Sequence, residues 1–186
     1  MADIPTGKTY LNPTHILEKL GISPGQIVAD FGCGGSGYFT LQAAKMVGNK
    51  GLVYAIDILK PALSAVLSKA KLMGLSNLKT VWSDLETVGA AKFISNNSLD
   101  IGLLKNVLYQ SKRKPEIIKE CARCLKKEAK LLVIDWEVIG LGFGPKKEDL
   151  VSKEDVIKMA TDIGLAKMES FKAGPYHWGL IFVKSG

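Results

Sequence analysis

The chain has 186 residues, of which 47% are hydrophobic and 23% are charged, with 19 Gly and 7 Pro. This is ordinary globular usage and the length suits one domain, so a disordered, collagen-like or fibrous chain is excluded. Basic residues exceed acidic ones by 25 to 18, but only Arg113 and Arg123 are arginines and the lysines are scattered along the chain. Scattered lysines indicate solvated surfaces, so nucleic acid is not an expected partner.

No membrane association is expected, because no apolar run approaches the roughly 18 to 20 residues that a membrane-spanning helix needs. The segment Met1–Thr9 lacks the apolar core of a secretion signal. The 3 cysteines are an odd number, which indicates a reducing compartment without a disulfide framework. We expect a soluble, cytoplasmic protein that is a monomer or a homodimer.

The first part of the chain alternates between helical and strand patterns. Asn12 can cap a first helix that ends at Gly21. The apolar run Gln26–Phe31 then leads through a glycine-rich loop into the helical pattern Tyr38–Val47, and Leu52–Ile58 is a second apolar run. This order predicts a βαβ unit.

The alternation continues through the middle of the chain. It predicts helices over Pro61–Gly74 and Pro115–Leu125 and strands over Leu78–Ser83, Leu99–Lys105 and Ala129–Trp136. Strands that alternate with helices and are apolar on both faces predict a mostly parallel sheet covered on both sides.

The last part of the chain changes character. Ser152 can cap a helix that ends at Gly164. The segments Leu165–Lys172 and Tyr176–Lys184 then read as two strands joined by a tight connection. They predict an antiparallel hairpin at the end of an otherwise parallel sheet.

A glycine-rich loop, GCGGSG, follows the first predicted strand and precedes a helix. Glycines let the chain turn tightly and bring backbone N–H groups to a ligand at the helix N-terminus. Gly32, Gly34 and Gly37 match the G-x-G-x-x-G dinucleotide fingerprint, and Asp57 follows about 20 residues past the loop, where an acid binds ribose hydroxyls. On these residues an NAD-dependent oxidoreductase is an open alternative.

Acidic residues at three predicted strand ends favour a different cofactor. Asp30 precedes the first glycine of the loop, where a carboxylate in the crevice would repel a pyrophosphate but would pair with an ammonium group. S-adenosylmethionine carries that ammonium group and no phosphate. The pair Ser83-Asp84 ends the third strand, where an acceptor can meet an adenine amino group. With Asp57, these acids lie at the carboxyl edge of the sheet, where open α/β sheets bind ligands.

Six segments in chain order resemble motifs of the class I S-adenosylmethionine-dependent methyltransferases, most closely the ubiquinone/menaquinone-biosynthesis-like (type 11) group. They are VADFGCG, VYAIDI, WSDLE, LDIGLLKNVLYQ, CLKKEAKLLVIDW and HWGLIFVK. The resemblance implies a Rossmann-like α/β methyltransferase fold, with a seven-stranded, mostly parallel sheet in the order 3-2-1-4-5-7-6 and strand 7 antiparallel. It further implies one such domain over residues 1–186, in which residues 1–25 form an arm and a helix that cover the site.

The resemblance also implies a set of residues that hold S-adenosyl-L-methionine and its product S-adenosyl-L-homocysteine. They are Asp30, Gly32, Gly34, Gly35, Asp57, Ile58, Ser83, Asp84, Leu85 and Lys105. The loop departs from the family pattern, because Ser36 stands where a glycine is usual and Gly37 comes one residue later. No metal is expected, because Cys121 and Cys124 share an apolar helical stripe and no second cysteine pair completes a zinc site.

Methyl transfer from a sulfonium is an in-line displacement that needs alignment and exclusion of water more than catalytic side chains. Asn106, which follows the fourth strand, is expected to position the acceptor by a hydrogen bond. If the acceptor must be deprotonated, His15 and His177 are the histidines available, and for each a structural role is the simpler interpretation. Tyr10 is expected to form one wall of the acceptor pocket.

Three further residues have two open interpretations each. Tyr109 and Trp136 either stack on a planar ligand or pack in the core. Asp135, at the end of the fifth strand, either faces the crevice or has a helix-capping or salt-bridge role.

The function that we expect is S-adenosylmethionine-dependent methyl transfer to a small organic molecule. Three alternatives stay open: methylation of a macromolecule, which the net charge of +7 would suit, an NAD-dependent oxidoreductase, and a non-catalytic S-adenosylmethionine-binding module. We also expect the arm Met1–Leu11 to close over the cofactor, because terminal segments are loose unless anchored.

Overall fold

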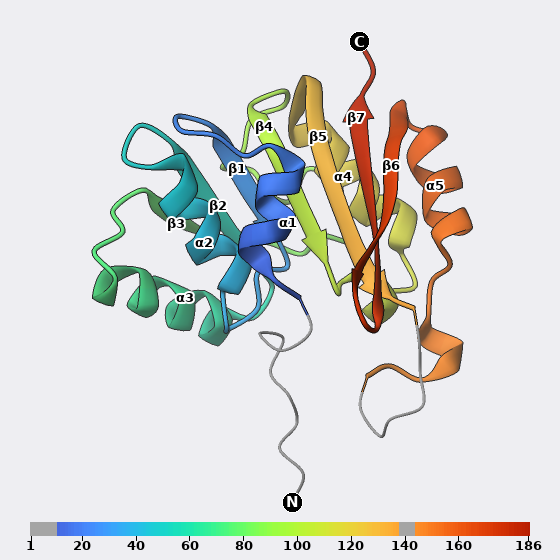
Figure 1. Cartoon of the computed structure of the whole chain (residues 1–186), viewed down its shortest axis with the longest axis horizontal. Helices are drawn as coiled ribbons and strands as arrows, with labels where there is room; N and C mark the ends of the chain where they lie inside the picture. The colour runs from blue at the N-terminus through green and yellow to red at the C-terminus, as the bar shows by residue number, and fades with distance from the viewer. Residues whose placement is uncertain (1–10, 138–143) are drawn as a thin grey trace, which may run out of the picture.

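The computed structural model describes residues 11–137 and 144–186. Its sheet has the order β3-β2-β1-β4-β5-β7-β6, with β7 antiparallel to both of its neighbours and the other pairs parallel (Figure 1). The strands are β1 (Ile27–Phe31), β2 (Leu52–Asp57), β3 (Leu78–Trp82), β4 (Leu99–Lys105), β5 (Leu125–Trp136), β6 (Leu165–Gly174) and β7 (His177–Lys184). The predicted fold class, strand order and terminal hairpin are confirmed.

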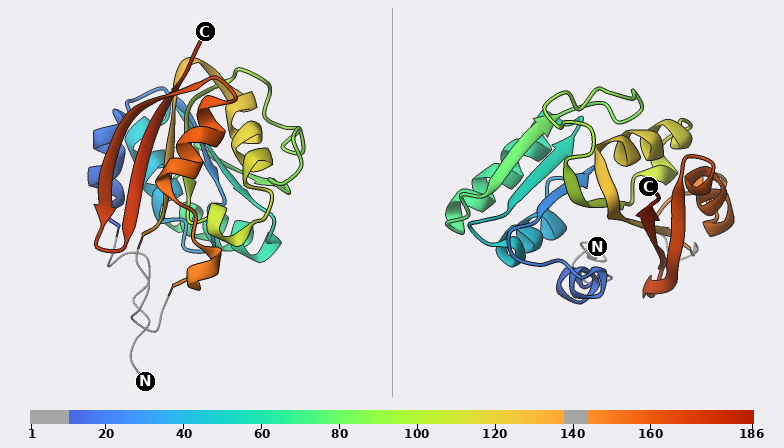
Figure 2. Two further views of the ribbon diagram at one scale, coloured as in Figure 1. Left: turned by 90° about the vertical axis from the view of Figure 1, so that its right-hand side faces the viewer. Right: turned by 90° about the horizontal axis from the view of Figure 1, so that it is seen from above.

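Helices cover both faces of the sheet. They are α1 (Pro13–Leu20), α2 (Tyr38–Val47), α3 (Lys60–Leu72), α4 (Lys114–Cys124) and α5 (Lys153–Thr161), with short 3-10 helices η2 (Leu108–Gln110) and η3 (Lys147–Asp149). Helices α1, α2 and α3 share one hydrophobic core with the sheet, and α4 and α5 share another on the opposite face (Figure 2, right). Among the residues that the structure describes, no helix is long and apolar enough to cross a membrane.

The central strand β4 shows why the sheet is buried on both sides. Leu103 belongs to the core on the α1–α3 face and Leu104 to the core on the α4–α5 face, and both are buried. Successive side chains of a strand point to opposite faces, so a continuous apolar run is what a covered parallel strand requires.

Strand β5 starts earlier than the sequence predicts, at Leu125 instead of Ala129. The residues between them are polar, so a search for apolar runs misses them. They form an irregularity in the strand, because Leu125 pairs with Leu99 and the next pair is Lys130 with Ile101, and Glu128 between them adopts a left-handed backbone with a φ of 63°. The strand thus includes residues whose side chains give no apolar signal.

The connection from β3 to β4, residues 83–98, contains no helix or strand and is called the β3–β4 loop below. It lies on the α4 face of the sheet, where Ala91 and Ile94 are buried in the core with α4 (Figure 2). This loop and the loops after β1, β2 and β4 meet at one edge of the sheet, because the carboxyl ends of parallel strands point the same way.

Candidate active site

A cavity of about 610 Å³ lies at this carboxyl edge. It is lined by the loops after β1, β2, β3 and β4, with Leu11 before α1, the start of α2, and Ile117 on α4. Its volume is within the roughly 300–1,000 Å³ that small-molecule sites occupy. It is therefore the candidate active site.

Most of the residues predicted from the sequence meet in this cavity. Those that line it are Gly32, Gly34, Asp57, Ile58, Ser83, Asp84, Leu85, Lys105 and Asn106. Gly35 and Asp30 lie next to it rather than on its surface, and His177 does not line it. Tyr10 and the rest of the predicted arm lie outside the described residues, apart from Leu11, which is buried and lines the cavity.

The glycine-rich loop forms one wall of the cavity. Gly32 has a φ of 80°, and a Cβ there would lie 2.4 Å from Cγ2 of Val107, so glycine is required by both backbone conformation and space. A Cβ on Gly34, with a φ of 62°, would meet no atom within 4 Å. The backbone at Gly34 is therefore open to a ligand.

Lys69 on α3 holds the part of this loop that departs from the family pattern. Its ammonium group donates to the carbonyl oxygens of Gly35 at 2.7 Å and Ser36 at 3.1 Å. Nothing in the sequence pointed to Lys69, because the contact joins residues more than 30 positions apart. The lysine therefore ties the backbone of Gly35 and Ser36 to α3.

Asp57 ends β2 and connects two loops of the cavity. One carboxylate oxygen accepts the N–H of Gly34 at 2.9 Å and the other accepts the N–H of Leu59 at 2.9 Å. The side chain is 9% exposed and lines the cavity. Oδ2 also accepts the thiol of Cys33 at 4.0 Å, whereas Oδ1 keeps a second lone pair, so the carboxylate can hold the loops and accept a hydrogen bond from a ligand at the same time.

Asp30 does not point into the crevice as the sequence suggested. It is fully buried, and its Oδ2 accepts the hydroxyl of Thr40 on α2 at 2.6 Å. Its Oδ1 lies 3.4 Å from Nζ of Lys105, whose ammonium group also lies 5.4 Å from the ring centre of Phe39. The ammonium group beside Asp30 is thus one that the protein supplies, and Asp30 is linked to the cavity through Lys105.

Asn106 follows β4 with a left-handed backbone, at a φ of 55°. Its N–H donates to the carbonyl of Ile134 at 2.8 Å, and its own carbonyl accepts from Gln110 at 2.7 Å, so the turn is held in this conformation. Its side-chain Oδ1 and the Oγ of Ser83 are buried without a hydrogen-bond partner among the described residues. Buried polar atoms in proteins are normally paired, so these two atoms in the cavity wall indicate a ligand.

The comparison with known proteins identifies the family. Residues 22–171 match the protein family described as a methyltransferase domain. The chain belongs to this methyltransferase family. The glycine spacing that also suited NAD is therefore the loop of a methyltransferase.

Solved structures similar to this methyltransferase share its fold over nearly the whole chain. An S-adenosylmethionine-dependent methyltransferase from Aquifex aeolicus is 26% identical with a TM-score of 0.85, over 97% of this chain and 94% of that one. A putative type 11 methyltransferase from Sulfolobus solfataricus is 25% identical with a TM-score of 0.76, over 95% and 94% of the two chains. These matches confirm the expected class of S-adenosylmethionine-dependent methyltransferase.

Curated relatives match this methyltransferase over part of their own length. The 2-phytyl-1,4-naphtoquinone methyltransferase of Synechocystis sp. is 30% identical over 134 residues, which are 72% of this chain and 55% of that protein. The chain spans about half the length of the curated relatives that it matches most extensively.

The cavity of the methyltransferase fits S-adenosylmethionine, the cofactor of the family. The unpaired oxygens of Ser83 and Asn106 can accept hydrogen bonds, and the cofactor has hydroxyl, amino and ammonium donors. The open backbone at Gly34 leaves space for close approach. Within the described ranges, no group of three or more His, Cys, Asp or Glu side chains could hold a metal ion.

His177 of the methyltransferase packs against Trp136, with the ring centres 4.2 Å apart. The side chain is 2% exposed, and neither ring nitrogen has a hydrogen-bond partner among the described residues. Burial lowers the pKa of His177 to about 4. The imidazole is therefore neutral at pH 7. Its role as a base stays a prediction. His15 is exposed on α1 and does not line the cavity.

Asp135 at the end of β5 is also buried, and it holds backbone instead of lining the cavity. Its carboxylate accepts the N–H of Trp136 at 2.8 Å and that of Tyr109, in η2, at 3.3 Å. Burial raises the pKa of Asp135 to about 6, although these hydrogen bonds act in the opposite direction. Asp135 therefore does not face the cavity, and it fixes the backbone of the turn after β5 and of η2 by hydrogen bonds.

The pKa shifts of His177 and Asp135 predict opposite effects of pH on stability. As pH drops from about 6.5 to about 4, His177 is protonated in the unfolded state but not yet in the folded state, so the free energy of unfolding falls. As pH rises from about 4 to about 6, Asp135 is ionised in the unfolded state but still protonated in the folded state, so the free energy of unfolding falls. We expect Asp135→Asn to become more stable with rising pH over this range, and His177→Phe less stable, each by up to about 3 kcal/mol. Urea unfolding at several pH values measures this, and parallel profiles for the two variants would contradict it.

Proposed function

We propose that this methyltransferase transfers the methyl group of S-adenosylmethionine to a small organic acceptor. The observation that carries the proposal is the cavity of about 610 Å³, in which acidic, glycine and apolar residues from four strand ends lie around unpaired polar atoms. The Synechocystis relative is named for a naphthoquinone substrate, and others for a cobalt-precorrin, which are organic molecules rather than macromolecules.

In this proposal two of the acids that line the cavity, Asp57 and Asp84, bind the polar groups of the nucleoside. The Asp57 carboxylate accepts the ribose hydroxyls, because it lines the cavity at the end of β2 and its Oδ1 has only one hydrogen-bond donor within the protein. Asp84 and the backbone of Leu85 meet the adenine edge, and Ile58 packs against the ring. The glycine-rich loop, including Gly32, Gly34 and Gly35, would hold the methionyl end, with the Asp30–Lys105 pair beside it. The cofactor would supply a methyl group on a sulfonium, whose carbon an acceptor lone pair would attack in line as the carbon–sulfur bond breaks and S-adenosylhomocysteine leaves.

The remaining lining suits an acceptor with an apolar body. Leu11, Phe39, Val107 and Ile117 present carbon surface. Asn106 Oδ1 would accept a hydrogen bond from a hydroxyl or amino group of the acceptor and so orient its lone pair towards the methyl group. The apolar wall excludes water from the reacting atoms.

Cofactor binding is tested by thermal unfolding with each candidate ligand. S-adenosylmethionine and S-adenosylhomocysteine are expected to raise the Tm, because a ligand that binds only the folded state stabilises it by about 2.7 kcal/mol at 100 times its Kd. NAD at the same concentration is expected to leave the Tm unchanged. A larger shift with NAD would overturn the cofactor assignment, and transfer of radiolabelled methyl to RNA or protein but to no member of a small-molecule panel would overturn the acceptor class.

The role of Asn106 predicts a loss of turnover without a loss of cofactor. Asn106→Gly keeps the left-handed turn, because glycine adopts positive φ freely, but removes the amide. We expect the variant to bind S-adenosylhomocysteine like the wild type and to lose roughly 5- to 150-fold in kcat/KM for the acceptor, as leaving the acceptor's donor group unpaired costs about 1–3 kcal/mol. Wild-type kcat/KM in this variant would show that Asn106 only shapes the turn.

A further inference from the structure

The β3–β4 loop forms a wall of the cavity without secondary structure of its own. Its first residues, Ser83, Asp84, Leu85 and Glu86, line the cavity. The rest of the loop has two left-handed residues, Gly89 with a φ of 87° and Asn97 with a φ of 52°. Without a helix or strand, the position of the wall depends on what the loop is attached to.

The loop is attached to a buried carboxylate on α4. Glu120 is fully buried, and its two oxygens accept the backbone N–H groups of Gly89 at 2.6 Å and Ala91 at 3.1 Å. The same oxygens accept Nε and Nη2 of Arg123, both at 2.8 Å. Burial alone would raise the pKa of Glu120, but these hydrogen bonds lower it below its usual value, so the group stays ionised.

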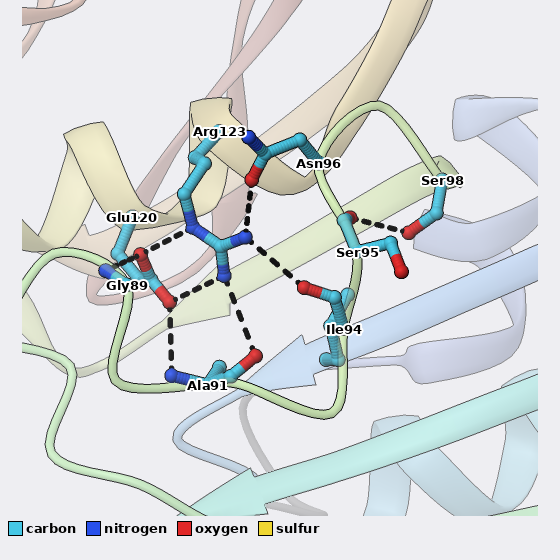
Figure 3. A network of polar contacts seen from close by, with 8 residues as sticks. All are labelled: Gly89, Ala91, Ile94, Ser95, Asn96, Ser98, Glu120 and Arg123. Atoms are coloured by element: carbon cyan, nitrogen blue, oxygen red, sulfur yellow. Dashed lines mark hydrogen bonds and ion pairs between the residues drawn. The ribbon is translucent and has the colours of Figure 1, made fainter.

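Arg123 extends the attachment to the far part of the loop (Figure 3). Its Nη1 donates to the side chain of Asn96 at 2.6 Å and to the carbonyl of Ile94 at 3.0 Å, and Nη2 lies 3.4 Å from the carbonyl of Ala91. Figure 3 shows the guanidinium between the helix and the loop, with contacts on both sides. The ion pair thus binds the loop through five groups, of which four are backbone.

A second attachment lies at the cavity itself. The hydroxyl of Ser111 donates to Glu86 at 2.6 Å and accepts the N–H of Arg113, just before α4, at 2.8 Å. Ile117, one turn of α4 before Glu120, lines the cavity. Helix α4 therefore contacts the ligand space directly and fixes the loop that forms the adjoining wall.

We propose that the Glu120–Arg123 ion pair is a positioning element that sets the adenine-side wall of the site, residues 83–86, and thereby the affinity for the nucleoside part of the cofactor. The proposal rests on the proposed function, because it takes the ligand to be S-adenosylmethionine. Neither residue touches the cavity, so the pair acts through the loop.

The test compares Arg123→Lys with a control that is destabilised elsewhere. Lysine keeps the positive charge but lacks the planar fork that joins Glu120 to the loop. Val156→Ala is the control, because Val156 is fully buried on α5 and makes no part of the loop or the cavity. Calorimetric titrations with S-adenosylhomocysteine and with adenosine give the affinities, and thermal unfolding gives the stability of each variant.

We expect Arg123→Lys to raise the Kd of both S-adenosylhomocysteine and adenosine at least tenfold, while Val156→Ala leaves both within twofold of the wild type. In a protein that already carries Asp84→Asn, Arg123→Lys should raise the Kd less than threefold. The contact of Asp84 with the adenine edge, which the ion pair positions, is already lost there. The milder variant Asn96→Ala removes one contact of the guanidinium. It should raise the Kd of S-adenosylhomocysteine and the Kd of adenosine by the same factor.

Affinities within twofold of the wild type in Arg123→Lys and Asn96→Ala would overturn the inference, whatever the change in Tm, and leave the proposed function intact. Equal weakening by Val156→Ala would also overturn it. A wild-type protein that does not bind S-adenosylhomocysteine would overturn the proposed function and the inference together.

Discussion

Replacing Asp57 with alanine is expected to weaken the binding of S-adenosylhomocysteine by about 2–4 kcal/mol, roughly 30- to 1,000-fold in Kd. The variant loses the proposed charge-assisted hydrogen bonds to the ribose. It also frees the N–H groups of Gly34 and Leu59, so the glycine-rich loop and the turn before α3 lose the carboxylate that joins them. Titration calorimetry measures the loss.

Two variants separate ligand contact from support of the loops. Asp57→Asn keeps one oxygen acceptor without charge, and we expect an intermediate Kd. Asp100→Asn is the matched control, because Asp100 accepts the N–H of Ile27 at 2.8 Å at the opposite edge of the sheet and lines no part of the cavity. It should leave the Kd unchanged. Binding by Asp57→Ala within threefold of the wild type would refute the assignment of Asp57.

Replacing Glu120 with alanine is expected to lower the free energy of unfolding by about 3–5 kcal/mol. The variant leaves Arg123 without its anion and frees the N–H groups of Gly89 and Ala91. For a chain of this length such a loss lowers the Tm by about 6–20 °C. Urea unfolding followed by circular dichroism measures it.

The asymmetry of the pair sharpens this prediction. The Arg123 side chain is 18% exposed and can reach water when Glu120 is removed, whereas Glu120 is fully buried and cannot when Arg123 is removed. We therefore expect the double variant Glu120→Ala, Arg123→Ala to cost less than the sum of the single ones. The more exposed pair Lys126–Asp100 is the control, and Lys126→Ala should cost less than about 1 kcal/mol. If Glu120→Ala lowers the free energy of unfolding by less than about 1 kcal/mol, the Glu120–Arg123 ion pair is not needed for stability and the prediction is wrong.

The sequence alone was sufficient for the fold, because its signals are local. Alternating apolar runs and helical periods predicted each α-helix and strand within a few residues but not the 3-10 helices η2 and η3, and the resemblance of the six motifs in order predicted the strand order. The same local logic placed Asp57, Asp84 and Asn106 at strand ends, and the structure has them around one cavity. A residue directly after a parallel strand reaches the carboxyl edge whatever the rest of the chain does.

The tertiary structure decided which of these side chains face the cavity and what holds its walls. Asp30 is turned into the core by Thr40 and Lys105, from two other elements, and this pairing depends on how α2 and β4 pack. The sequence of the β3–β4 loop has no helical or strand periodicity, and the loop is held in place by a buried ion pair on α4. The i, i+3 spacing of Glu120 and Arg123 is visible in the sequence, but the same spacing on an exposed helix would contribute little. Burial gives the pair its strength, and burial is a property of the assembled fold.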